Sequence, residues 1–286
     1  MHIAKKILLG IFICSGIALS FIQDARCQET TFNLRTRYLL QADLDNRSGE
    51  IDITETVTHL QVDDKVAGKL PVTFSAKIKY LTIDESVTLD VPNSLIGRQF
   101  SLGTKFPVPY VDWNNCYIGI DLMPALYTDD WDWADSAFRL PFRAYFIHRP
   151  NEQLTLVAGA LVRIDYDQEI WPILGLIYKP DDRLTINLAS NEPNIRYRLT
   201  DRLTLIGEFD LTSDEYEVTR NNDNNVVLTY RQFGTGLGAE YTLDENISAV
   251  MTLGRVFARK MEYLDTGEEL YPEASFYING KISWQY

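Results

Sequence analysis

Hydrophobic and polar residues alternate along most of the chain after about residue 30. From Phe276 to Tyr286, hydrophobic side chains and Gly280 occupy every second position, and almost wholly polar side chains lie between them. Because successive side chains of a β-strand point to opposite faces, this pattern predicts a strand with one apolar and one polar face. The same split recurs at 73–80, 138–146 and 203–211, with Ile206 as an exception. The pattern predicts an all-β chain.

The alternating segments predict about fourteen strands. Two of them, near 184–188 and 195–199, are short, so a count of twelve remains open. Short connections rich in Pro, Asp and Asn alternate with longer, more acidic ones, which is typical of a transmembrane up-and-down antiparallel β-barrel. An even count places both termini on the periplasmic side. The expected strands start at Thr31, Ile51, Pro71, Arg98, Asn115, Ala137, Gln153, Ile170, Arg183, Asn194, Arg202, Val226, Asn246 and Tyr271.

The N-terminus has the features of an export signal. Lys5 and Lys6 precede an apolar run over 7–22, and small residues follow near Ala25 and Cys27. We therefore expect a signal peptide over 1–27, Sec-type export with its removal, and one barrel domain over 28–286. Lipid attachment at Cys27 is the less favoured alternative. No later apolar run reaches the roughly 18 residues that a transmembrane helix needs.

Composition excludes several protein classes. The chain has 40 acidic and 27 Lys and Arg residues, a net charge of -13 and 45% hydrophobic residues. This content argues against disorder, and the acidic balance argues against nucleic-acid binding. Beyond residue 27, Cys116 is the sole cysteine of the sequence, so no intramolecular disulfide is expected, and an apolar strand position is its simplest interpretation.

A soluble β-sandwich also has one apolar face, so alternation alone does not identify a membrane protein. The export signal, the many Tyr and Trp residues near strand ends, the unequal connections and a chain that ends on an aromatic strand together favour a barrel in the membrane. The expected surroundings are outer-membrane lipid.

Two parts of the sequence carry a family resemblance. The ending Ile282-Ser283-Trp284-Gln285-Tyr286 resembles the C-terminal strand that the barrel-assembly machinery reads, which marks Trp284 and Tyr286 as the assembly signal. The segments 171–180, 194–199 and 203–210 resemble an uncharacterised domain-of-unknown-function family of bacterial outer-membrane β-barrels. The resemblance implies a bacterial outer-membrane location and implies no particular activity.

If the apolar faces contact lipid, the polar faces line the lumen. Ten bases then face five acids, which is the reverse of the net charge and favours a narrow, porin-like channel for small solutes, including anionic ones. The alternative is that these charges pair and close the lumen, leaving a structural or surface-interaction barrel that acts through its extracellular loops. The expected lumen residues are Arg35, Arg37, Lys77, Lys79, Arg139, Arg143, Arg163, Arg196, Arg198 and Lys281, with Asp121, Asp165, Glu208, Asp210 and Glu240.

Metal binding, sugar binding and catalysis have weak support in the sequence. The acidic loop at 129–135 offers ligands for calcium and, through Trp131 and Trp133, a face for a sugar, but a solvated loop with both Trp side chains at the membrane interface is the favoured interpretation. His59 and His148 have no nucleophile motif nearby, and no G-x-S-x-G elbow occurs. We expect no enzyme activity, no cofactor and no metal site.

Overall fold

The structure is a computed structural model that describes residues 29–45, 48–66, 69–85, 91–108, 115–131, 137–164, 166–167, 169–189, 192–220 and 223–286. Within this part of the chain no helix is both long and apolar enough to cross a membrane. The described residues form seventeen strand segments: β1 (Glu29–Asp43), β2 (Glu50–Val66), β3 (Leu70–Glu85), β4 (Ser94–Pro107), β5 (Cys116–Leu122), β6 (Ala125–Thr128), β7 (Phe138–Arg139), β8 (Phe142–His148), β9 (Leu154–Val162), β10 (Ile170–Tyr178), β11 (Leu184–Asn187), β12 (Asn194–Arg198), β13 (Leu203–Arg220), β14 (Asp223–Thr242), β15 (Ile247–Tyr263), β16 (Glu268–Leu270) and β17 (Ser275–Gln285).

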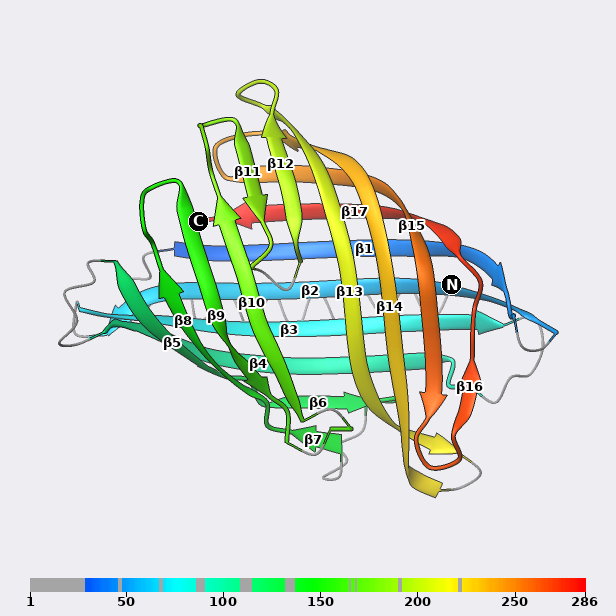
Figure 1. The fold of residues 1–286 in the computed structure, drawn as a ribbon. Coiled ribbons are helices and arrows are strands. Elements are labelled where there is room, and N and C mark those ends of the chain that lie inside the picture. Colours follow the sequence, from blue (N-terminus) through cyan, green and yellow to red (C-terminus); the bar gives the residue numbers. More distant parts are fainter. Residues whose placement is uncertain are drawn as a thin grey trace.

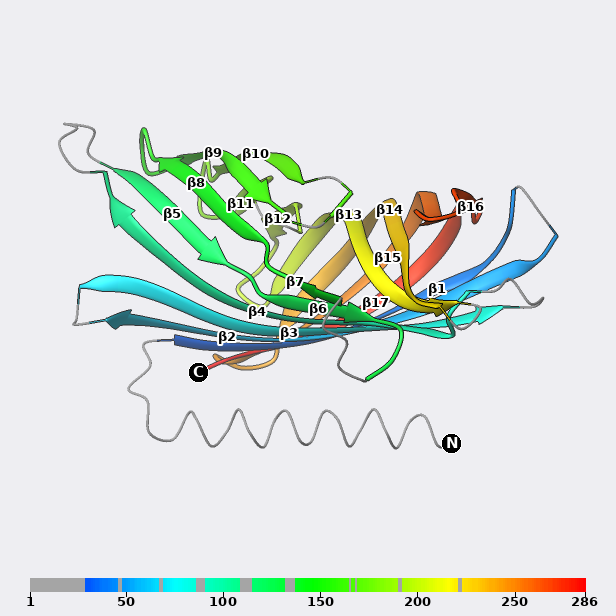
Figure 2. The same ribbon diagram turned by 90° about the horizontal axis from the view of Figure 1, so that it is seen from below.

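These segments make one closed antiparallel barrel of fourteen strands (Figure 1). Three places in the ring are each shared by two segments, namely β5 with β6, β7 with β8, and β16 with β17. The ring closes where β1 pairs with β17, and Thr30 and Tyr286 exchange backbone hydrogen bonds of 2.8 Å. In Figure 2, β9 to β12 lie on the opposite side of the barrel from β1 to β3.

The predicted barrel and its count of fourteen are confirmed, and the alternative count of twelve is wrong. The two weakest predicted strands exist as β11 and β12, which have 4 and 5 residues. Local turn chemistry fixes many of the strand starts. At four turns one side-chain oxygen accepts the backbone N–H groups two and three residues later: Asn151, Asp181, Thr200 and Asp244. The two N–H donors lower the pKa of Asp181.

We call the end of the barrel that carries these turns and both chain ends the terminal end, and the opposite end the far end. Residue polarity inverts between them. On the terminal half of β15, Leu253 is exposed on the outside and Thr252 is buried inside. On its far half, Met261 is fully buried inside while Lys260 and Glu262 lie outside and form an ion pair. A β-bulge between the two halves adjusts the register against β14.

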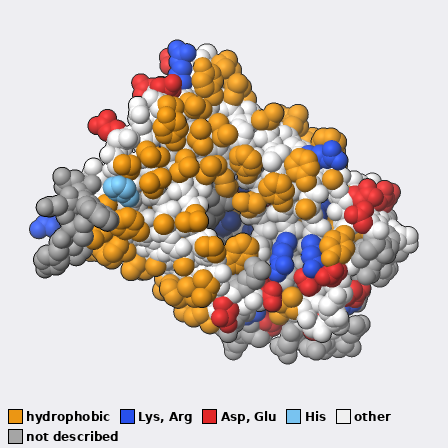
Figure 3. All heavy atoms as spheres, viewed as in Figure 1, with side chains coloured by type: hydrophobic (Ala, Val, Ile, Leu, Met, Phe, Trp, Pro, Cys, Tyr) orange, Lys and Arg blue, Asp and Glu red, His pale blue; other side chains and the backbone are white. Residues whose placement is uncertain are grey.

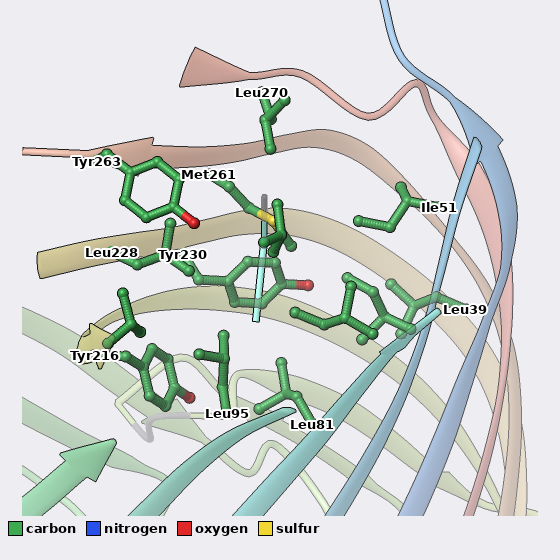
Figure 4. Close-up of a cluster of buried hydrophobic side chains, with 14 of the residues drawn as sticks. Leu39, Ile51, Leu81, Leu95, Tyr216, Leu228, Tyr230, Met261, Tyr263 and Leu270 are labelled. Carbon is green, nitrogen blue, oxygen red and sulfur yellow. The ribbon is translucent and has the colours of Figure 1, made fainter. Parts of the chain in front are cut away.

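The far end therefore has a hydrophobic core inside the barrel (Figure 4). We call it the hydrophobic cluster, and it joins side chains on or beside β1 to β4 and β13 to β17. An apolar interior fits this half because water, and not lipid, is expected outside it. Its members are Leu39, Leu44, Ile51, Ile53, Leu81, Ile83, Val91, Leu95, Tyr216, Val218, Val226, Leu228, Tyr230, Val256, Met261, Tyr263, Leu270 and Tyr277.

Candidate functional site: the barrel lumen

The terminal half of the lumen encloses a cavity of about 620 Å³. Its walls come from both sides of the barrel, from β1 to β5 and from β8 to β12, with Lys281 of β17. Six basic side chains and His59 line it, against two acidic ones, Asp121 and Glu192. The basic ones are Arg35, Lys77, Lys105, Arg143, Arg149 and Lys281.

Strand register aligns the polar groups of this cavity in a row. Asn33, His59, Lys77 and Gln99 are consecutive partners across β1, β2, β3 and β4, so their side chains point to the same face. Arg35 is in turn the register partner of Lys281. Cations and hydrogen-bonding side chains thus converge on one wall of the cavity.

The acids of the cavity are already paired. Asp121 accepts from Nε of Arg143 at 2.6 Å, and Glu192 accepts from Nη1 of Arg35 at 2.8 Å. Within the described part of the chain, Lys77, Lys105, Arg149 and Lys281 make no ion pair. Lys77 and Lys281 are half-buried, whereas Lys105 and Arg149 are exposed. Cations that make no ion pair leave a positive potential in the cavity, and this potential favours an anion.

A belt of ion pairs separates the cavity from the hydrophobic cluster. Lys79 is buried and lies 2.9 Å from both Glu55 and Asp214, and Glu55 also accepts from Arg35 at 2.8 Å. Because Lys79 belongs to β3 and Asp214 to β13, this pair spans the lumen. The belt restricts the axial path at this level.

A second part of the belt lies beside the first. Arg37 is 3% exposed and its Nη1 lies 2.5 Å from Oδ2 of Asp210, which also accepts from the side-chain amide of Gln232. Tyr277 stacks under the guanidinium of Arg37, with 4.8 Å from Cζ to the ring centroid, and donates its hydroxyl to Glu208 at 2.9 Å. These charges are satisfied mainly by one another.

The structure separates the predicted lumen residues into groups. Arg35, Lys77, Arg143, Lys281 and Asp121 line the cavity, while Arg37, Lys79, Glu208 and Asp210 belong to the belt. Arg196 pairs with Glu240, and Arg198 is an exposed side chain near the terminal mouth. Arg139 is buried beside Tyr166, and Arg163 lies near the start of β10 against Tyr166 and Glu215. Asp165 lies outside the described residues.

Sequence reasoning missed the cavity residues Lys105, Arg149 and Glu192 and two further features. The hydrophobic cluster was not predicted, because alternation alone does not say which face of a strand points inward. The thiol of Cys116 also has a neighbour, Nδ1 of His148, at 3.1 Å, because the two residues are register partners on β5 and β8. Cys116 lies at the start of β5, as the strand position predicted for it requires, and it is 3% exposed.

The described residues contain no group of three or more His, Cys, Asp or Glu side chains that could hold a metal ion. Of the acidic loop, residues 132–136 lie outside the described residues. Trp131 at its start stacks on Tyr80, with 6.3 Å between the ring centroids. The solvated loop, which we favour over calcium or glycan binding, stays a prediction, as does the absence of enzyme activity.

Comparison with solved structures shows the fold. The COG4313 outer membrane channel from Pseudomonas putida F1 is similar with a TM-score of 0.52 and 11% identity, over 92% of this chain and 97% of that one. A deltaS2 mutant of the TodX monoaromatic hydrocarbon channel is similar with a TM-score of 0.47 and 10% identity, over 90% and 89% of the two chains. The fold is thus that of outer-membrane β-barrels.

Sequence comparison gives the family. Curated proteins gave no match. The family model described as domain of unknown function (DUF6268) matches residues 125–279, which run from β6 to β17 and include the segments whose resemblance was noted above. Because this match covers more than half of the chain, the protein belongs to the DUF6268 family, as its sequence led us to expect.

Proposed function

We propose that this barrel lies in the bacterial outer membrane, with its terminal end toward the periplasm, and passes small anionic solutes through its lumen. The observation that carries the proposal is the cavity, where six basic side chains meet two acids that are already paired. The placement rests on the short turns and both chain ends at the terminal end.

Charge decides which solute enters this lumen. An anion in the cavity meets Lys77 and Lys281, which make no ion pair among the described residues, beside the amide groups of Asn33 and Gln99. A cation would meet only acids that already pair with arginine. The ion-pair belt and the hydrophobic cluster narrow the axial path, so we expect a low conductance.

The test is single-channel recording of the refolded protein in a planar bilayer under a salt gradient. We expect small openings whose reversal potential shows anion preference, and the double variant Lys77→Gln/Lys281→Gln should lose most of that preference. The control variant Lys65→Gln/Lys69→Gln removes the same charge at the same end but outside the cavity lining, so its selectivity should remain that of the unaltered protein.

One observation favours a second candidate, a closed barrel that acts through its surface. The hydrophobic cluster fills the far end with fully buried side chains such as Tyr216 and Leu228. If the protein inserts into the bilayer as a heat-modifiable barrel but never conducts, passage of hydrated ions is contradicted and this candidate gains.

A further inference from the structure

The barrel wall is interrupted between β10 and β13. The two strands between them, β11 and β12, are so short that β10 pairs with β11 only at Ile177 and Tyr178. On the other side, β12 pairs with β13 only from Thr204 to Glu208. Beyond these pairs, Leu188 still bonds to Leu176 and Phe209 to Pro193. Farther toward the far end, the described residues give β10 and β13 no other backbone partner on the sides that face each other until Glu217 bridges to β6.

Because β11 and β12 are so short, a wide gap remains between β10 and β13. Three strand spacings separate β10 from β13 at the level of the β11–β12 hairpin, which amounts to about 14 Å between backbones. Figure 3 shows a hollow over this region, surrounded by hydrophobic side chains and with basic side-chain atoms at its bottom. We call this gap the side window.

The edges of the side window carry backbone groups that have no partner among the described residues. Leu176 accepts from the N–H of Leu188 at 2.8 Å, so by alternation Leu174 also directs its backbone polar groups into the window. Phe209 donates to Pro193 at 2.9 Å, so Leu211 does the same from the other side. Pro172 lies on the same edge of β10, where a residue without an N–H is tolerated because no strand needs it.

The window joins the cavity to the outside of the barrel. Ile173 and Ile177 of β10 and Asn194 of β12 line the cavity and also border the window. On the outside, Leu174 is 80% exposed and Leu211 is 61% exposed, so the rim belongs to the apolar surface. Toward the far end the window is bounded by Arg163, whose Nη1 donates to the carbonyl of Ser213 at 3.1 Å.

Open strand edges are costly in hydrocarbon, where each unsatisfied backbone group costs several kcal/mol, and they are tolerated only where they line a cavity that contains water or a polar group. The side window must therefore give water or another polar group access to a rim that faces lipid. A molecule with one charged end and one apolar end satisfies both requirements, since its head reaches the basic cavity while its tail contacts Leu174 and Leu211.

We propose that the side window is the route by which an amphipathic anion, with a carboxylate, sulfonate or phosphate head and an apolar tail, passes between the lumen and the membrane. This inference rests on the proposed function and adds the substrate class and the path. It also explains why the cavity favours an anion although the hydrophobic cluster obstructs the path along the barrel axis beyond it.

The test closes the window with a cleavable linker. Leu174 and Leu211 both point outward, so the double variant Leu174→Cys/Leu211→Cys should fold, and a bis-thiosulfonate linker of about 14 Å should join the two thiols. The readout is the initial uptake of radiolabelled decanoate by intact cells that carry the protein in an outer membrane with lipopolysaccharide. We expect linking to lower uptake to the rate of cells without the protein, and reduction to restore it.

The matched control links two lipid-facing residues where the wall is continuous. Leu237 and Leu253 are exposed register partners on β14 and β15, so linked Leu237→Cys/Leu253→Cys should leave uptake unchanged. Linker-treated unaltered protein controls for the buried Cys116. Equal losses in both pairs, or linkers of this length that fail to join Leu174→Cys to Leu211→Cys in the folded barrel, contradict the window.

The outcomes also separate this inference from the proposed function. If linking has no effect while Lys77→Gln/Lys281→Gln lowers decanoate uptake, the proposed route through the side window is wrong and the proposed anion passage is still supported. Uptake equal to that of cells without the protein, together with anion-selective conductance, leads to the same conclusion. If linking lowers decanoate uptake but the protein shows no conductance, the route through the side window is supported and the passage of hydrated ions is contradicted.

Discussion

At the scale of single residues, close packing around Tyr277 limits what two glycines can become. A Cβ atom at Gly254 would lie 2.2 Å from Cζ of Tyr277, and one at Gly236 would lie 2.3 Å from its hydroxyl oxygen. Both glycines sit inside the barrel, where the ring of Tyr277 also supports Arg37 and bonds to Glu208. The two glycines therefore position one member of the ion-pair belt.

Gly254→Ala should destabilise the barrel, because the rigid ring of Tyr277 must move and lose its contacts. We expect a loss of about 1–3 kcal/mol, the usual range for overpacking. The measurement is the urea midpoint of the barrel in detergent, followed by its heat-modifiable band on a gel.

The control for this prediction is Gly207→Ala, where the added Cβ would meet only Leu237 Cδ2 at 3.7 Å, an ordinary contact. Combining Gly254→Ala with Tyr277→Ala should cost less than the two separate losses together, because the clash has been removed. Additive losses would show that the clash is relieved elsewhere.

At the scale of elements, the closing strand pair tests the predicted assembly signal. Trp284 pairs with Phe32 of β1 and with Ile247 of β15, and Tyr286 forms the last backbone bonds of the seam with Thr30. Trp284 and Tyr286 are both exposed on the barrel surface, as residues read by another protein should be. Their role as a signal stays a prediction.

Trp284→Ala/Tyr286→Ala should slow assembly by the barrel-assembly machinery far more than it lowers the stability of the assembled barrel, because the exposed rings make few contacts in the finished fold. The measurement is pulse-chase formation of the heat-modifiable form in cells. Tyr241→Ala removes a comparably exposed aromatic ring at the terminal end and should assemble at the rate of the unaltered protein. Equal delays in the two variants would contradict a specific signal.

The strand positions were predictable because local signals specify them. Turn oxygens such as that of Asp181 and regular alternation give strand starts within four residues of the observed ones. The ends were less predictable, since the alternation at 203–211 stops nine residues before β13 ends at Arg220. Shortness was also readable at β11 and β12. Its consequence, the side window, was not, because a gap depends on how far the neighbouring strands β10 and β13 continue beyond the pairs they form.

At the scale of the whole molecule, charge pairing depends on three-dimensional neighbours. The inward basic excess was predictable from alternation, yet Arg143 and Arg196 pair with Asp121 and Glu240, whereas Lys77 and Lys281 make no ion pair among the described residues. The alternation along the sequence shows which face of its strand each residue occupies. Register and strand curvature decide which charges on that face come within reach of one another.

The polarity inversion predicts that the two halves of the barrel differ in what stabilises them. Ile53→Ala, in the hydrophobic cluster, should cost about 2–5 kcal/mol, as other core truncations do. The loss should appear as faster hydrogen exchange at the far ends of β2, β14 and β15, with the terminal half still protected.

The matched variant is Leu253→Ala, which shortens an exposed side chain on the lipid-facing half of β15. We expect exchange at the far end to stay unchanged in this variant. Uniformly faster exchange along the strands in Ile53→Ala would show that the barrel opens as one unit and that the cluster has no separate stability.

The hydrophobic cluster has a further consequence for the conditions in which the protein is stable. A core that excludes water weakens on cooling and strengthens when sulfate or sucrose is excluded from the protein surface. A lipid-facing wall responds instead to acyl-chain length and bilayer thickness. Solutes in the medium should thus tune the far end, and membrane composition the terminal end, so that one ring of strands responds separately to the water outside the cell and to the lipid around it.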